Sequence, residues 1–117
     1  MRRVYHLVTP SVWRQAAGGP YRAASLTTEG FIHCSHADQV ARSANRFYAD
    51  ADDLLALCLD AERLGEALRE EPASGGELFP HVYGPIPPDA VADVRPLRRG
   101  PDGLWTFAPF GTRNEER

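Results

Sequence analysis

The sequence contains no lysine, and all 13 of its basic residues are arginine. Set against 16 acidic residues, they leave a net charge of −3. The chain therefore lacks the basic excess with which general nucleic-acid binders neutralise phosphates, and we expect no nucleic-acid partner. A guanidinium binds anions well, but an arginine bias spread over the whole chain says little about any one site.

Long apolar runs are also missing. No stretch approaches the ~18–20 residues that span a bilayer, and residues 1–9 lack the apolar core of a signal peptide. We therefore expect a cytoplasmic protein with no membrane partner. At 117 residues the chain is too short for a second hydrophobic core, so we expect one domain over residues 1–110. Residues 111–117 have nothing to bury and are expected to form a disordered tail.

Cysteine is scarce, and its two positions favour a structural role. Cys34 and Cys58 both lie in apolar runs, where a reduced thiol behaves as a small hydrophobic group. Neighbouring residues on a strand point to opposite faces, so the thiol of Cys34 should point away from the imidazole of His33. No set of His, Cys, Asp and Glu has the spacing of a metal site, and we expect no metal.

Hydrophobic periodicity predicts an α+β fold with a small, mainly antiparallel sheet, one main helix and one short N-terminal helix. Residues 4–8 alternate as a strand, and the apolar run 54–59 is typical of a central strand buried on both faces. A short helix should begin at Thr9-Pro10 and end before Gly18. Residues 35–48 carry apolar side chains at helical spacing after a capping-box-like start at Ser35, and should form the main helix.

The remaining segments are assigned largely from turn signals. Residues 23–26 and 30–34 are predicted to be paired strands joined through a turn at Gly30. Residues 61–64 and 68–70 suggest a helical turn and a short strand. The segment 79–88, with four prolines, is predicted to be an irregular but rigid loop that presents side chains at low entropic cost. Residues 91–97 and 104–107 should form a terminal hairpin.

The four histidines are the main candidates for chemistry: His6, His33, His36 and His81. Three of them lie in or beside apolar, strand-like segments. One explanation is structural, with each ring bonded to a carbonyl in the core. The other is that rigid strands hold several imidazoles toward one cleft, where they bind a ligand or transfer protons near neutral pH.

Tyr21, Tyr48 and Tyr83 could form a stacking surface for a flat ligand, although tyrosines at element ends also serve plain packing. Tyr83 is the best candidate of the three, because it lies two residues from His81 and shares its side if the chain is extended. Arginines such as Arg22, Arg46 and Arg95 could bind phosphate, but an arginine is usually solvated surface.

Together these motifs resemble the bacterial family known as domain of unknown function 952. The resemblance rests on VYHLV (4–8), EGFIHCS (29–35), NRF (45–47) and PHVYGPIP (80–87), and covers nearly the whole chain. It implies an ADP-ribosyltransferase-like fold, a small split sheet that holds NAD between its halves. The segment 31–35 is also similar to a strand of RNA 2′-phosphotransferases.

The resemblance implies that His6 binds a ribose hydroxyl and that His33 lines the nicotinamide side. His81 or Tyr83 would stand near the position from which other families offer a catalytic glutamate. The NAD-binding hypothesis adds Tyr21, Ser35 and Tyr83 to His6 as residues that hold NAD as the substrate, and assigns catalysis to His33 and His81.

The sequence departs from the transferases at one position. They commonly place a carboxylate near the developing positive charge, where this chain offers His81, with Glu77 and Glu29 as further options. Three hypotheses follow: an NAD-binding transferase-like enzyme with an unknown acceptor, a non-catalytic small-molecule or nucleotide-binding module, and a weaker RNA-directed enzyme. The Gly-rich signature of a Rossmann unit is absent. The sequence leaves the oligomeric state open.

Overall fold

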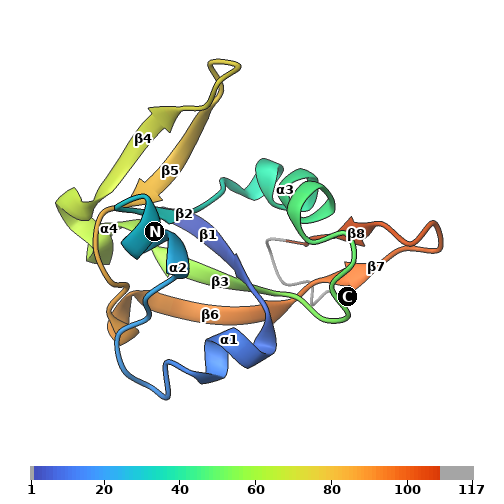
Figure 1. The fold of residues 1–117 in the computed structure, drawn as a ribbon, viewed down its shortest axis with the longest axis horizontal. Coiled ribbons are helices and arrows are strands. Elements are labelled where there is room, and N and C mark those ends of the chain that lie inside the picture. Colours follow the sequence, from blue (N-terminus) through green and yellow to red (C-terminus); the bar gives the residue numbers. More distant parts are fainter. Residues whose placement is uncertain (1, 109–117) are drawn as a thin grey trace.

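A three-stranded antiparallel sheet forms the centre of the molecule in the computed structural model, which describes residues 2–108 (Figure 1). Its strands are β1 (Arg3–Val8), β3 (Leu55–Asp60) and β6 (Val91–Pro96), in the order β1-β3-β6. Four of the six residues of β3 are buried, as a strand covered on both faces requires. The prediction of a central strand over this apolar run is confirmed, as is the first strand.

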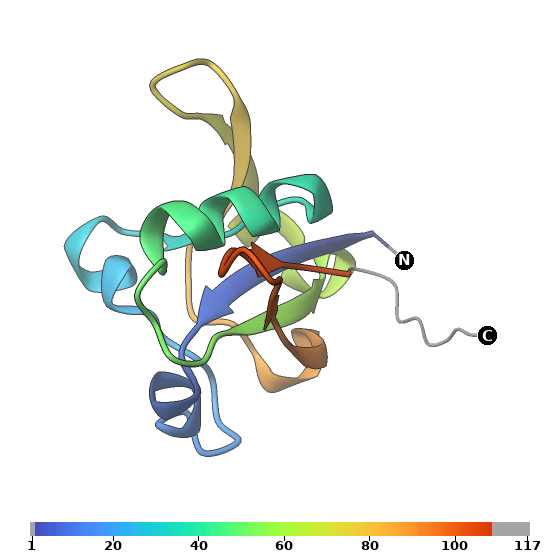
Figure 2. The same cartoon turned by 90° about the vertical axis from the view of Figure 1, so that its right-hand side faces the viewer.

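A second three-stranded antiparallel sheet has the order β2-β5-β4. It consists of β2 (Ile32–His33), β5 (Leu78–Val82) and β4 (Leu68–Pro72). The β4–β5 hairpin projects from the body of the molecule (Figures 1 and 2). The two sheets are joined where Ser35, just after β2, exchanges two backbone hydrogen bonds with Tyr5 of β1, at 2.7 and 2.8 Å.

The first sheet is covered on both faces. On one face, Tyr5, Leu7, Ala56 and Cys58 pack against α3 (Val40–Phe47), which follows the 3₁₀ turn η1 (Ala37–Gln39). On the other face, side chains of β1 and β3 share a core with the second sheet; these are Val4, Val8, Leu57, Leu59, Ile32, Cys34 and Val82. The two core clusters follow from the alternation of side chains along β1 and β3.

The remaining elements are short. They are α1 (Pro10–Arg14), α2 (Ala24–Thr28), α4 (Ala61–Leu64), η2 (Gly65–Ala67), η3 (Pro88–Ala90), β7 (Arg98–Arg99) and β8 (Trp105–Thr106). The short N-terminal helix, the helical turn at 61–64 and the strand beginning at Leu68 were all predicted.

The predicted strand over residues 23–26 is wrong, and so is its pairing with residues 30–34. Residues 24–28 form α2, whose last turn is closed by backbone bonds from Glu29 and Gly30 to the carbonyl of Ser25. Gly30 adopts a φ of 90°, which glycine reaches without strain. The strand β2 that follows pairs with β5 instead, in contact with the core.

The irregular loop predicted for residues 79–88 is wrong in its first half, which belongs to β5. Proline is usually confined to positions where no N–H is needed in a ladder. Pro80 lies opposite Cys34, one residue beyond the end of the two-residue β2, and takes part there only through its carbonyl, which accepts from Cys34 N at 2.9 Å. His81 therefore lies on a strand and not on a loop.

Two further boundaries differ from the predictions. The capping box before the main helix is formed by His36 and Gln39, one residue later than the expected Ser35, and Phe47 is 69% exposed where a buried residue was expected. Residues 91–96 pair with β3, so the terminal hairpin is reduced to β7 and β8.

The predicted class, a small α+β fold with antiparallel sheets and few helices, is confirmed. The radius of gyration of 13.9 Å fits a compact chain of this length. None of the helices in the described part is long and apolar enough to cross a membrane. The tail predicted for residues 111–117 lies outside the described residues.

Candidate functional site

The second sheet buries one face and leaves the other open. Ile32, Cys34, Pro80 and Val82 point into the core and are buried. Side chains alternate along a strand, so their neighbours point the other way. The opposite face, called here the open face, carries Phe31, His33, Arg69, Glu71, His81 and Tyr83, which are half-buried or exposed. It gathers three of the six residues that the sequence analysis singled out.

Aromatic and imidazole rings make close contact on the open face. His33 and His81 are direct cross-strand partners, and their ring centroids lie 5.4 Å apart. Phe31 stacks on His81 with a centroid distance of 4.1 Å and an interplanar angle of 20°. Its ring is also 5.4 Å from that of Tyr83. Such a surface of rings suits contact with a flat ligand.

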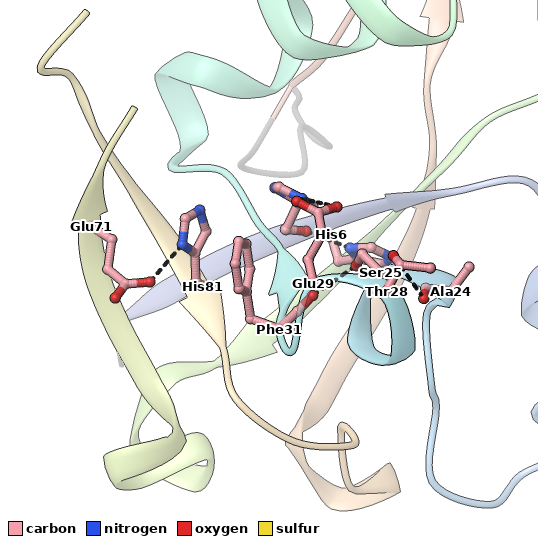
Figure 3. Close-up of polar contacts among 9 residues, drawn as sticks. His6, Ala24, Ser25, Thr28, Glu29, Phe31, Glu71 and His81 are labelled. Carbon is pink, nitrogen blue, oxygen red and sulfur yellow. Dashed lines mark hydrogen bonds and ion pairs between the residues drawn. The ribbon is translucent and has the colours of Figure 1, made fainter. Parts of the chain in front are cut away.

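A carboxylate that the sequence analysis missed, that of Glu71, organises one side of this face. Its Oε1 accepts hydrogen bonds from the Tyr83 hydroxyl at 2.6 Å and from His81 Nδ1 at 2.8 Å. The hydrogen bonds from Tyr83 and then His81 lower the pKa of Glu71, and the bond between Tyr83 and Glu71 raises the pKa of Tyr83. In Figure 3 the ring of His81 lies between Glu71 and Phe31.

Two further charged groups border the open face. Glu29, in the turn before β2, accepts from His33 Nε2 at 3.1 and 3.2 Å. The guanidinium of Arg69 lies over the ring of Tyr83, 4.5 Å from its centroid. The face therefore combines two imidazole–carboxylate pairs with a cation and stacked rings.

His6 lies beneath the site, in the interior. It is 7% exposed, and both of its ring nitrogens have partners. Nδ1 is 2.6 Å from the carbonyl oxygen of His33, and Nε2 is 2.9 Å from the hydroxyl of Tyr21. Because a carbonyl only accepts, Nδ1 carries the proton and Nε2 accepts from the hydroxyl of Tyr21.

Burial keeps this pair uncharged. Desolvation lowers the pKa of His6 to about 4, although its bond to the His33 carbonyl acts in the opposite direction. Desolvation raises the pKa of Tyr21 to about 12. A ligand could reach His6 only by displacing Tyr21 or the His33 carbonyl.

Ser35 is buried as well, at 5% exposure, and its backbone is held by β1. Its hydroxyl lies 3.5 Å from that of Ser43. The structure thus divides the six sequence candidates into two groups. His33, His81 and Tyr83 meet on the open face, whereas His6, Tyr21 and Ser35 lie in the interior next to it. Their proposed ligand contacts stay predictions.

The other sequence candidates lie outside the open face. His36 pairs with Glu70 at 2.7 Å. Glu77 is bound by Arg42 and Gln39 near the tip of the hairpin. Cys34 belongs to the core, where burial raises the pKa of its thiol. Among residues 2–108, no group of three or more His, Cys, Asp or Glu could hold a metal ion.

The sequence analysis missed Phe31 and Glu71, and only the first of them could have been found from the sequence. Phe31 alternates with His33 in the primary sequence, so its place on the same face could have been inferred. Glu71 could not, because its contact with His81 depends on the register of β4 against β5, in which Glu71 faces Phe79.

Comparisons with known proteins identify a family and similar solved structures. A family model described as "Protein of unknown function (DUF952)" matches residues 7–94. The crystal structure of protein CC0527 from Caulobacter crescentus is similar, with 31% identity, a TM-score of 0.81, and coverage of 90% of this chain and 94% of that chain. The solution NMR structure of CC0527 has 32% identity, a TM-score of 0.73, and coverage of 89% and 91%. A search of the curated proteins finds no match.

Proposed function

The chain belongs to the DUF952 family, whose description names no reaction, and we propose from its own side chains that it is an NAD-binding, ADP-ribosyltransferase-like enzyme. Its working surface is the open face, and its acceptor is a molecule that the family description does not name. A cytoplasmic location is part of the same proposal.

The arrangement of the strands supports the fold assignment within this proposal. Two three-stranded sheets joined at Tyr5 and Ser35 have the form of a split sheet. Histidines lie on one strand of the first sheet and on two adjacent strands of the second, at His6, His33 and His81. The resemblance noted in the sequence assigns the nucleotide to these strands.

One observation carries the proposal: Glu71 lies on the open face, beside stacked rings and imidazoles. The sequence alone offered no carboxylate next to His81. A transferase site needs one near the ribose, because breaking the nicotinamide bond produces positive charge that a carboxylate offsets. Glu71 is ionised at neutral pH like any ordinary carboxyl group, and the hydrogen bonds from Tyr83 and His81 lower its pKa further.

The donor set on the open face fits a dinucleotide. Phe31 and Tyr83 offer ring surfaces for a flat base, and the guanidinium of Arg69 offers donors to a phosphate. His33 and His81 offer ring nitrogens for hydroxyl groups. When bound, NAD would supply an activated N-glycosidic bond, and these residues would orient the ribose and move a proton.

Ligand-dependent stabilisation tests the proposal. A ligand that binds only the folded state raises the melting temperature in a concentration-dependent way. We expect NAD and ADP-ribose to stabilise the wild type, and His81→Ala and Tyr83→Phe to weaken the effect. The matched control is His36→Ala, which removes a histidine outside the open face and should respond to NAD as the wild type does. Absence of any shift with NAD, ADP-ribose and nicotinamide would overturn the proposal.

A second candidate is a non-catalytic nucleotide-binding module on the same fold. It is favoured by the buried state of His6, whose two ring nitrogens are already bonded within the protein. Measuring the release of nicotinamide from NAD distinguishes the enzyme from the binding module. An enzyme liberates nicotinamide from NAD in a His81-dependent way, whereas a binding module shows the stabilisation without the release.

A further inference from the structure

Two imidazole–carboxylate pairs lie on or beside the open face, and they are held very differently. The side chains of His33 and Glu29 are 54% and 50% exposed, and the two residues are four apart in one local segment. The side chains of His81 and Glu71 are 13% and 32% exposed and come from two paired strands. His81 is therefore the more firmly held imidazole.

The ring of His81 is fixed from two sides. Phe31 stacks on its plane, and Glu71 accepts from its Nδ1 at 2.8 Å. The same carboxylate oxygen also accepts from the hydroxyl of Tyr83. An ionised carboxylate has no proton to give, so Nδ1 of His81 must carry the hydrogen.

The hydrogen on Nδ1 determines the state of the other ring nitrogen of His81, Nε2. In a neutral imidazole with the proton on Nδ1, Nε2 holds a lone pair. Within residues 2–108, no group is bonded to Nε2 of His81. This nitrogen therefore has a lone pair that no group in the described part of the chain uses, and that lone pair can accept a proton.

We propose that Glu71 is a positioning residue that holds His81 in the Nδ1–H form, so that Nε2 removes the proton of a hydroxyl acceptor, an alcohol or water. This inference rests on the proposed function and names its acceptor class. The proton of the acceptor goes to Nε2, and the acceptor oxygen forms the new bond to the ribose carbon. The bond from that carbon to nicotinamide breaks, and its electron pair leaves with the ring nitrogen.

The proton balance selects the acceptor. Nicotinamide leaves as a neutral molecule and needs no general acid, so the reaction requires only one proton transfer. A carboxylate or phosphate acceptor is already ionised and has no need of a base. A hydroxyl group is neutral and gains from a positioned base, a contribution of ~10²–10⁴-fold in rate. A firmly held imidazole whose Nε2 has no partner in the described part of the chain therefore matches a hydroxyl acceptor.

The imidazole nitrogen signals of the unliganded protein test the positioning step. At a pH where imidazoles are neutral, long-range ¹H–¹⁵N spectra distinguish a protonated from an unprotonated ring nitrogen. We expect His81 to be in the Nδ1–H form in the wild type and in Tyr83→Phe, which keeps Glu71. In Glu71→Gln we expect a mixture with the Nε2–H form. A wild-type His81 in the Nε2–H form, or a Glu71→Gln protein with unchanged signals, would overturn the inference.

Nicotinamide release tests the acceptor class with defined probes. With water or methanol as the acceptor, His81→Ala should lower turnover about 10²-fold or more. With inorganic phosphate as the acceptor, the same substitution should matter far less. Equal loss with both kinds of acceptor would contradict the hydroxyl assignment. The proposed function has its own test. It fails if the wild type neither binds NAD nor releases nicotinamide, whichever ring nitrogen of His81 carries the proton.

Discussion

His6 and His81 are both bonded through Nδ1 to an oxygen atom of the protein, yet they differ in the other ring nitrogen. Nε2 of His6 meets the hydroxyl of Tyr21 at 2.9 Å inside the core. Nε2 of His81 has no partner within residues 2–108. The comparison shows that one strand holds a histidine with both ring nitrogens bonded in the core, whereas another holds a histidine with one ring nitrogen bonded on the open face. We expect a histidine whose second ring nitrogen is bonded within the protein to serve stability, and one whose second nitrogen has no such partner to serve binding.

The two regions also differ in how they hold charge. The interior pair of His6 and Tyr21 stays neutral because burial penalises the charged form of each. On the open face, hydrogen bonds from Tyr83 and His81 stabilise the charged form of Glu71 and lower its pKa. Substitutions in the interior should therefore affect stability, and substitutions on the open face should affect ligand binding and turnover.

The largest effect is expected for His6→Ala. It leaves the Tyr21 hydroxyl and the His33 carbonyl unsatisfied in the core, each at ~1–3 kcal/mol, and opens a cavity. We expect the free energy of unfolding to fall by ~4 kcal/mol in urea denaturation. His36→Ala, the control at a partly exposed site, should change it by less than ~1 kcal/mol. Similar values for the two variants would remove the distinction between interior and surface histidines.

The second prediction concerns pH. The pKa of His6 is about 4 in the folded protein, against 6.5 for an unperturbed histidine. Between these two pH values, the unfolded chain is protonated at His6 and the native protein is not. Stability contributed by this group is present above pH 6.5 and is lost as pH falls toward 4, by ~3 kcal/mol in total. Denaturation curves between pH 7 and pH 5 should show the loss, ahead of the carboxylates. His6→Gln should show a flatter dependence, and an equally steep one would disprove the assignment to His6.

A smaller loss is expected for Tyr21→Phe. The substitution keeps the ring but removes the donor to Nε2 of His6, leaving one buried acceptor without its bond. We expect ~1–2 kcal/mol less stability, measured by urea denaturation. In the double variant Tyr21→Phe with His6→Ala, the cost should be less than the sum of the two single costs, because the substitutions remove the same interaction. Additive costs would mean that the two side chains act independently.

The smallest change in stability is expected for His33→Ala. Its side chain is 54% exposed and its pair with Glu29 is exposed too, a class of ion pair that contributes ~0–1 kcal/mol. The carbonyl that His6 needs belongs to the backbone and is retained. We expect a melting temperature close to that of the wild type, together with weaker stabilisation by NAD. A large drop in melting temperature would place His33 with the structural histidines.

Prediction from the sequence succeeded for segments whose own residues are enough to indicate their secondary structure and burial. The run at 54–59 is apolar throughout, so a strand buried on both faces was the natural solution, and β3 confirms it. Alternation in residues 4–8 likewise predicted which side chains of β1 share a face. The pairing of His81 and Tyr83 on one side was also foreseen, because they are two residues apart.

Sequence reasoning failed where the structure depends on distant partners. Residues 24–28 have no clear period, and their helical turn is set by the backbone bonds that close it at Ser25. The prolines argued against a strand at 78–82, but the short β2 leaves Pro80 at a place that needs no N–H. Glu71 joins the site only through the register of β4 against β5, which the primary sequence does not reveal.

The central claim is that the open face is the part of this molecule that binds NAD. The most direct measurement is a titration of the ¹⁵N-labelled protein with NAD, followed by the amide and imidazole signals of each residue. The account predicts changes that saturate and centre on Phe31, His33, Glu71, His81 and Tyr83, with much smaller changes at His36 and in α3. No change at saturating NAD, or changes centred on another surface, would contradict it.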